Sequence, residues 1–366
     1  MSQEPSESRA YAPGIATDDL LLIQKHTSPA VWRALSGQRI FITGGTGFIG
    51  CWLLETLLWA DKHFQLGLSL LVLTRNPAAF SAKAPHLACY PSLQLVQGDV
   101  TDLGFFNESV DIVLHAATDV ANAGSKPQKV FDDIVNGTKQ TLDLAVRCKA
   151  RRYLLTSSGA VYGRQPDDMT HIPESYMGAP DTLQPGTAYG QGKRVSEWLV
   201  QCTSVEHQLE SRVARVFALL GPYLPLDAHF AAGNFIRDAM AGKEIKVGGD
   251  GTAYRSYLYT ADMVIWLLTI LIEGAAGQAY NLGSDQAISI RQLAAAVSSV
   301  VLGEERVSVS VTAPLGVPVQ RYVPDIDKAR RDLKLFVHTD LSSAIRKTVD
   351  WTIMRSSSSR AYSGNS

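Results

Sequence analysis

From residue 39 onward, short apolar runs alternate with longer segments whose apolar positions recur at helical spacing. Short apolar runs between polar or glycine residues predict buried strands, and apolar positions three and four apart predict helices. Strands are expected at 39–43, 68–74, 93–97, 111–115, 152–157 and 211–216. Helices are expected between them at 48–60, 129–149 and 189–207. This alternation predicts an α/β protein with a Rossmann-type, doubly wound parallel sheet.

The pattern changes after Gly221-Pro222. Loop and helix are expected from about Pro225 to Gly251, followed by the remaining predicted elements: helices near 261–273 and 289–302, a strand near 307–311 and a last helix near 340–353. Residues 1–37 form an N-terminal extension, in which 1–18 are polar and predicted to be disordered. Its apolar positions from Leu20 to Leu35 predict a short segment packed on the body. The serine-rich residues 354–366 are predicted to be a disordered tail.

Three glycines, Gly44, Gly47 and Gly50, lie between the first predicted strand and the first predicted helix. The first permits a tight turn, the second lets a pyrophosphate approach the backbone, and the third lets helix and strand pack closely. The helix opens with Phe48 and Ile49, and its free N–H groups and positive dipole end favour a phosphate. The sequence therefore predicts a dinucleotide-binding turn.

Two further motifs predict catalysis. Tyr189 and Lys193 are four residues apart, so on a helix both side chains face the same site. We expect the ammonium to lower the pKa of the Tyr189 phenol, which suits proton transfer near neutral pH. Ser158 places a hydroxyl at the carboxyl end of a predicted strand, where open α/β sheets bind ligands.

Together with Gly98-Asp99-Val100, His115-Ala116-Ala117, Asn136-Gly137-Thr138 and Gly248–Arg255, these motifs resemble those of the extended short-chain dehydrogenase/reductase family, in its nucleotide-sugar epimerase and dehydratase branch. The resemblance covers about residues 38–352. It implies a dinucleotide-binding domain at 38–224 and a smaller C-terminal α/β substrate lobe at 225–353, interleaved with a loop at 164–187. It also implies a homodimer formed through helices 129–149 and 189–207.

The resemblance further implies roles for single residues. Tyr189 would take the proton of a sugar hydroxyl, usually at C4, while Lys193 holds the nicotinamide ribose and Ser158 hydrogen-bonds the C4 oxygen. Arg255 would grip the substrate pyrophosphate, since a guanidinium fork fits phosphate oxygens; a salt bridge with Asp262 is the alternative. Ala218 stands where the family often has asparagine, and Asn234 is a candidate replacement contact.

The cofactor is expected to be NADP or NAD. The second predicted strand ends in Thr74-Arg75 with no acid for a ribose 2′-hydroxyl, and Arg75 suits a 2′-phosphate, which slightly favours NADP. By resemblance Asp99, with Val100 beside it, would bind the adenine portion. His115, Ala116 and Ala117 would lie against the cofactor, with His115 in a structural role.

The net reaction is left open between several possibilities. Gly159 and Ala160 stand where a resembling 4,6-dehydratase carries an acidic pair and a decarboxylase typically carries a glutamate. A 4-epimerase or 4-keto reductase acting on a nucleotide-diphosphate sugar therefore leads. Residues 190–197 resemble the catalytic helix of the decarboxylase branch, so a nucleotide-sugar decarboxylase is one alternative. An NADP-dependent reductase of a non-sugar carbonyl is another.

Composition narrows the class further. The chain has 366 residues and a net charge of −1, so its overall charge does not favour binding to nucleic acid or to an anionic membrane. The four cysteines are scattered without CxxC spacing, which predicts neither a metal site nor a disulfide framework. The polar N-terminus shows no secretory signal pattern. A cytoplasmic enzyme without a metal is expected.

Overall fold

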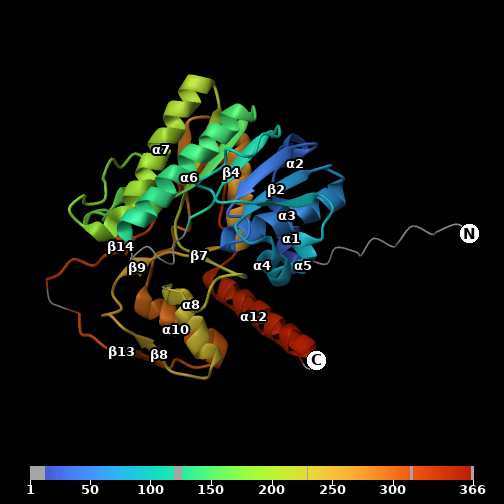
Figure 1. Ribbon diagram of the computed structural model, residues 1–366. Helices are drawn as coiled ribbons and strands as arrows, with labels where there is room; N and C mark the ends of the chain where they lie inside the picture. Colours follow the sequence, from blue (N-terminus) through green and yellow to red (C-terminus); the bar gives the residue numbers. More distant parts are fainter. Residues whose placement is uncertain (1–12, 119–125, 229, 314–315, 364–366) are drawn as a thin grey trace, which may run out of the picture.

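The computed structural model describes residues 13–118, 126–228, 230–313 and 316–363 and is built around one large sheet (Figure 1). Seven parallel strands follow the order β11-β6-β5-β4-β1-β2-β3. The six expected strands are present within a residue of their predicted bounds, as β1 (Arg39–Thr43), β2 (Ser69–Thr74), β3 (Leu93–Gln97), β4 (Ile112–His115), β5 (Arg152–Ser158) and β6 (Glu210–Val216). The predicted Rossmann-type sheet is confirmed.

The seventh strand, β11 (Gln278–Leu282), lies inside the segment that the sequence assigned to the substrate lobe. It pairs with β6, and it follows α9 (Thr260–Glu273), in which every residue from Thr260 to Leu271 is buried. A helix that is apolar on all sides belongs in a core. The sheet therefore includes β11, and its covering layer includes α9, from beyond the predicted boundary at residue 224.

Alternation along the strands gives the sheet two apolar faces. On β1, Ile40 and Ile42 face the cluster that includes α3 (Phe48–Phe64) and α9. Phe41 faces the opposite cluster, which includes side chains of α6 (Pro127–Arg147) and α7 (Ala188–His207). Helices α6 and α7 lie side by side on that face (Figure 1). Successive strand side chains point to opposite faces, so one strand supports both layers.

The smaller lobe lies below the sheet in Figure 1 and is built from short elements. Its helices are α8 (Ala231–Met240), α10 (Ile290–Leu302) and α11 (Asp327–Leu333). Its strands pair as β13 (Val307–Val309) with β8 (Ile245–Val247), and as β12 (Ile288–Ser289), β9 (Tyr254–Arg255) and β14 (Arg321–Tyr322) in a three-stranded sheet. The remaining elements are α4 (Pro77–Lys83), α5 (Pro85–Ala88), η1 (Gly159–Tyr162), η2 (Pro185–Thr187), β7 (Leu219–Leu220) and β10 (Leu258–Tyr259).

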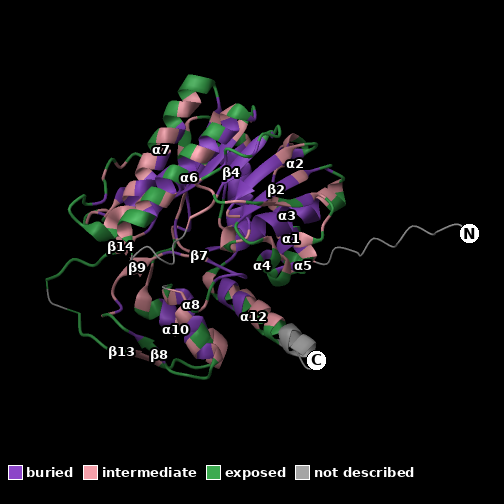
Figure 2. Cartoon of the chain, in the orientation of Figure 1, coloured by how far each residue is buried: buried purple, intermediate pink, exposed green. Residues whose placement is uncertain are grey.

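The N-terminal extension packs on the body, as its apolar pattern predicted. Helices α1 (Thr17–His26) and α2 (Pro29–Leu35) bury apolar side chains in the same core as α3 and α9 (Figure 2). The carboxylate of Asp19, only 1% exposed, accepts hydrogen bonds from Tyr259 Oη at 2.7 Å and Lys347 Nζ at 2.6 Å. The predicted disorder at 1–18 is wrong for Ile15, which is 4% exposed, and for Thr17 and Asp18, which begin α1. Residues 1–12 lie outside the described residues.

The last helix, α12 (Leu341–Ser363), continues through residues that the sequence predicted to be a disordered tail. Arg355 is held there by the aromatic rings of Tyr223 and Trp351, which lie 5.5 Å and 5.2 Å from its guanidinium carbon. Serine tolerates a helix at modest cost, and no glycine or proline follows before Gly364. Within the described part of the chain, no helix is long and apolar enough to cross a membrane.

Candidate active site

The glycine turn has the geometry of a phosphate cradle. Gly44 has φ 71°, and a Cβ there would lie 2.5 Å from the carbonyl oxygen of Ala116. A Cβ on Gly50 would lie 2.2 Å from the carbonyl oxygen of Gly44. Gly47 is the N-cap of α3, and Phe48 and Ile49 begin the helix. Side chains at the first and third glycines would collide with neighbouring backbone, so these glycines permit the close packing that a dinucleotide-binding turn needs at the N-terminus of α3.

His115 fixes the end of β4 against this turn. Its Nδ1 lies 2.7 Å from Thr43 Oγ1, and the same Oγ1 accepts the N–H of Ala117 at 3.2 Å. Burial lowers the pKa of His115 to about 3, with a smaller contribution from the charge of Lys193. His115 is therefore neutral, and it holds the backbone of Ala116 and Ala117 in place beside Gly44.

The residues expected to bind the adenosine portion meet at the ends of β2 and β3. Arg75 is exposed directly after β2. The carboxylate of Asp99 accepts the Oγ1 and N–H of Thr101 at 2.7 and 2.9 Å, and these bonds, with help from Arg75, lower its pKa. Val100 packs against α6, where a Cβ on Gly137 would lie 3.2 Å from its side chain.

The three expected catalytic residues are brought together from β5 and α7. Lys193 is 2% exposed, and its Nζ donates to Thr118 Oγ1 at 2.7 Å and to the carbonyl of Thr156 at 2.8 Å. This Nζ lies 6.0 Å from the ring centre of Tyr189. Burial lowers the pKa of Lys193 to about 8, against the opposing charge of Glu197. Ser158 is the last residue of β5 and hydrogen-bonds Tyr189.

The expected direction of the Tyr189 pKa is wrong for this structure. Burial raises the pKa of the phenol, and the hydrogen bond from Ser158 opposes that rise only in part. The ammonium of Lys193 is turned toward Thr118 and Thr156, so its charge does not outweigh the desolvation. The phenol is kept protonated until a further group stabilises its anion.

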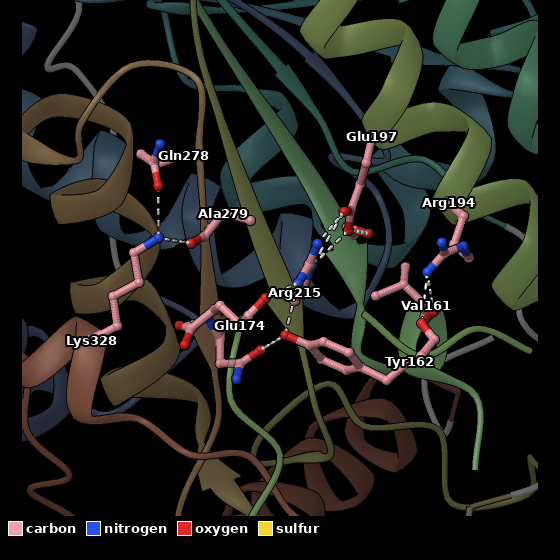
Figure 3. Close-up of polar contacts among 12 residues, drawn as sticks. Val161, Tyr162, Glu174, Arg194, Glu197, Arg215, Gln278, Ala279 and Lys328 are labelled. Carbon is pink, nitrogen blue, oxygen red and sulfur yellow. Dashed lines mark hydrogen bonds and ion pairs between the residues drawn. The ribbon is translucent and has the colours of Figure 1, made fainter. Parts of the chain in front are cut away.

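A partly buried ion pair between Glu197 and Arg215, which no sequence motif indicated, joins α7 to β6 (Figure 3). Glu197, one helical turn after Lys193, accepts Arg215 Nη2 at 2.7 Å and Ser157 Oγ at 2.5 Å. Arg215 also donates to Tyr162 Oη at 2.8 Å. The i+4 spacing from Lys193 was the available signal for Glu197. The pair joins α7 and β6 to the residue before Ser158.

The same network anchors the loop at 164–187 to the edge strand β11. Tyr162 Oη donates to Asn281 Oδ1 at 2.7 Å, and the Asn281 N–H donates to Glu174 at 2.7 Å. Arg194 on α7 donates to the carbonyls of Val161 and Gly178 (Figure 3). Burial raises the pKa of Glu174. The loop is thus fastened at both its sheet side and its helix side.

The predicted substrate contacts lie in the smaller lobe. Asn234 lines a pocket of about 580 Å³ between α8, β8 and the loop 248–251. Arg255 follows on β9, and its guanidinium carbon lies 6.0 Å from the ring centre of Tyr322. Asp262 instead accepts the backbone N–H groups of His338 and Thr339 at 3.1 and 3.0 Å. The Asp262 carboxylate therefore already has hydrogen-bond donors from the backbone, which disfavours the alternative role of Arg255 as its salt-bridge partner.

The fold and site together define a dinucleotide-dependent enzyme. The family model for the NAD-dependent epimerase/dehydratase family matches residues 40–283, and the chain belongs to that family of enzymes. UDP-glucuronic acid decarboxylase 6 of Arabidopsis thaliana is 33% identical over 301 residues, covering 81% of this chain and 84% of the relative. UDP-glucuronic acid decarboxylase 1 of Xenopus tropicalis is 30% identical over 318 residues, covering 86% and 72%.

Solved structures share the fold. An epimerase of Methanothermobacter thermautotrophicus aligns with TM-score 0.76 and 23% identity, covering 93% of this chain and 98% of the other. UDP-glucose 4-epimerase of Thermotoga maritima, solved with UDP-glucose, aligns with TM-score 0.73 and 20% identity, covering 87% and 99%. These likenesses show a shared fold.

Proposed function

We propose that the protein oxidises C4 of the sugar in a nucleotide-diphosphate sugar. The convergence of Ser158, Tyr189 and Lys193 beside the glycine turn carries this proposal. NAD or NADP, when bound, accepts the C4 hydride and returns it. Once ionised, Tyr189 takes the C4 hydroxyl proton, and Ser158 donates a hydrogen bond to the developing oxyanion. The ammonium of Lys193, 6.0 Å from the Tyr189 ring centre, offsets the desolvation of the phenolate only in part.

For the net reaction we propose decarboxylation of UDP-glucuronic acid, because the curated relatives described above carry this activity. Once C4 is a ketone, the C6 carboxylate is β to it. The C5–C6 bond then breaks, CO₂ leaves, and the electron pair passes to the C4 oxygen as an enolate. Ser158 and Tyr189 hydrogen-bond that oxygen while C5 takes a proton from solvent, and Tyr189 returns its proton to the C4 oxygen as the C4 ketone is reduced.

A second candidate is a 4-epimerase or 4-keto reductase, which Gly159 and Ala160 favour. The residues after Ser158 supply no carboxylate, and a Cβ on Gly159 would lie 2.6 Å from Phe217. Epimerisation and 4-keto reduction need only the proton relay and room for the sugar to turn. Arg255 and the pocket beside Asn234 favour a nucleotide-diphosphate substrate over a non-sugar carbonyl.

The test is a product assay on the purified protein supplied with NAD or NADP. UDP-glucuronic acid should give CO₂ and a UDP-pentose by mass spectrometry, whereas interconversion of UDP-glucose and UDP-galactose would favour the second candidate. Tyr189→Phe should lower turnover by at least about 100-fold and leave cofactor binding intact, since it removes one general acid–base group. Full activity of Tyr189→Phe would contradict the mechanism.

For the cofactor we propose NADP in preference to NAD, on the exposed guanidinium of Arg75 at the end of β2. Calorimetric titration with each dinucleotide tests this choice. Arg75→Ala should weaken NADP binding about tenfold or more and leave NAD binding nearly unchanged, because only NADP carries the 2′-phosphate. Equal losses of NADP and NAD affinity in Arg75→Ala would contradict the preference for NADP.

We also propose a homodimer through α6 and α7. Trp198 and Val205 lie seven residues apart on α7 and are 65% and 74% exposed. Large exposed apolar side chains on one helix face suit a partner helix. Gel filtration should show a dimer that Trp198→Glu disrupts, and a monomer at micromolar concentration would contradict this assembly. A cytoplasmic location is proposed on the four free cysteines.

A further inference from the structure

Tyr322 brings a second phenol to the catalytic serine, and it comes from the smaller lobe. It lies on β14, which pairs in parallel with β9 so that Tyr322 stands opposite Arg255. Its Oη lies 3.5 Å from Ser158 Oγ, across 164 residues of sequence. The two lobes therefore meet at the hydroxyl that is expected to contact the reacting oxygen.

The position of this phenol is fixed by close packing. The Tyr322 ring lies 4.6 Å from the ring of Phe217, centre to centre. A Cβ on Gly159 would lie 2.7 Å from Tyr322 Oη and 2.6 Å from Phe217. The missing side chain at Gly159 therefore leaves the space in which the phenol reaches Ser158.

Counting donors and acceptors assigns a direction to this contact. A serine hydroxyl has one proton and two lone pairs. One lone pair of Ser158 Oγ accepts the N–H of Ala160 at 3.2 Å. Burial raises the pKa of Tyr322 far above its usual range, so this phenol keeps its proton and donates it to the second lone pair. When Tyr189 ionises it can only accept, so the one proton of Ser158 is left for the Tyr189 phenolate, and this hydrogen bond lowers the pKa of Tyr189.

We propose that Tyr322 is a positioning residue that donates to Ser158 and thereby directs the Ser158 proton toward Tyr189 and the sugar oxygen. The part that concerns the sugar rests on the proposed function; the relay from Tyr322 through Ser158 to Tyr189 does not. Its consequence is a Tyr189 that ionises more readily, because a donated hydrogen bond stabilises the phenolate.

Other charged and titratable groups also face this relay and stay unchanged when the Tyr322 hydroxyl is removed. Lys193 approaches Tyr189 from α7, Arg255 approaches Tyr322 from β9, and Tyr162 lies near Tyr322 from η1. A change in the ionisation of Tyr189 in Tyr322→Phe therefore reports the lost donation to Ser158.

The test needs no substrate. Protein labelled with ¹³C at the tyrosine ring carbon that bears oxygen is titrated by NMR, with Tyr189→Phe identifying the Tyr189 signal. Tyr322→Phe keeps the ring and its packing, and should raise the Tyr189 pKa by about one unit, a tenfold change in the ionisation equilibrium. Tyr254→Phe, on the same small sheet, is the control and should leave the Tyr189 titration unchanged.

A double variant shows whether the effect passes through Ser158. Ser158→Ala should itself raise the Tyr189 pKa, and Tyr322→Phe added to it should produce no further shift. Additive shifts, or an unchanged Tyr189 signal in Tyr322→Phe, would overturn the proposal.

Kinetics add a separate readout. In Tyr322→Phe, kcat should fall about tenfold with KM nearly unchanged, and the acid limb of the pH–rate profile should move up with the Tyr189 pKa. A fall in kcat with an unmoved acid limb would overturn the relay. Failure of the proposed function is distinguishable, because it would appear as wild-type protein that turns over none of the nucleotide sugars.

Discussion

Two glycines with the same backbone angle allow the role of the cofactor turn to be measured. Gly44 and Gly37 both have φ 71°, but a Cβ on Gly44 would meet the Ala116 carbonyl at 2.5 Å, whereas nothing lies within 4 Å of one on Gly37. A left-handed conformation costs a non-glycine residue about 1–2 kcal/mol. Overpacking adds about 1–3 kcal/mol. Gly37→Ala should therefore show only the cost of the left-handed conformation, and Gly44→Ala should show that cost together with the cost of overpacking.

The assay is urea denaturation of both variants, together with calorimetric titration of the dinucleotide. Gly37→Ala should keep wild-type affinity, because it lies away from the turn. Gly44→Ala should be less stable than Gly37→Ala by the overpacking cost and bind the cofactor at least about tenfold more weakly, since each 1.4 kcal/mol is a factor of ten. If Gly44→Ala and Gly37→Ala lost the same stability and bound the cofactor equally well, the inference that Gly44 permits a close approach of β1 and β4 would be refuted.

Two further predictions concern the buried charges behind the site. Burial lowers the pKa of Lys193 from 10.5 to about 8, so the unfolded chain holds this proton more tightly, and the free energy of unfolding should rise through this group from pH 8 to 10.5. In urea denaturation this rise should be absent from Lys193→Met and should therefore appear in the difference between wild type and variant. Glu197→Gln should cost about 1–3 kcal/mol in the same assay, because it removes the charged partner of the partly buried guanidinium of Arg215. The exposed pair of Asp133 with Lys129 is its control, and Asp133→Asn should leave the urea midpoint nearly unchanged. Similar losses for the two variants would contradict a stabilising network at Glu197.

Local patterns predicted the parts of the site whose signal lies within a few residues. The glycine turn, the strand ending in Ser158 and the Tyr189/Lys193 spacing each specify a conformation by themselves, and the structure brings them together. Strand β11 was not predicted, because five residues of mixed polarity carry little periodic signal and become a strand only by pairing with β6.

The rest of the site depends on tertiary contacts that no spacing reveals. Tyr322 lies on a two-residue strand far along the chain from Ser158. Arg215 follows the ordinary alternation of β6, and only the fold brings it to Glu197. The pKa of Tyr189 was predicted in the wrong direction because the sequence gives the charge of Lys193 but not the desolvation of the phenol.

The burial of Asp19 has a consequence for the order in which the chain becomes folded. Its two partners, Tyr259 and Lys347, follow it by 240 and 328 residues. At about 5–20 residues per second, the ribosome needs roughly 15–65 s to deliver the second partner. A carboxylate has a strong penalty for leaving water without its cation. Helix α1 is therefore synthesised long before the residues on which Asp19 docks, and during that interval it is available to chaperones and proteases.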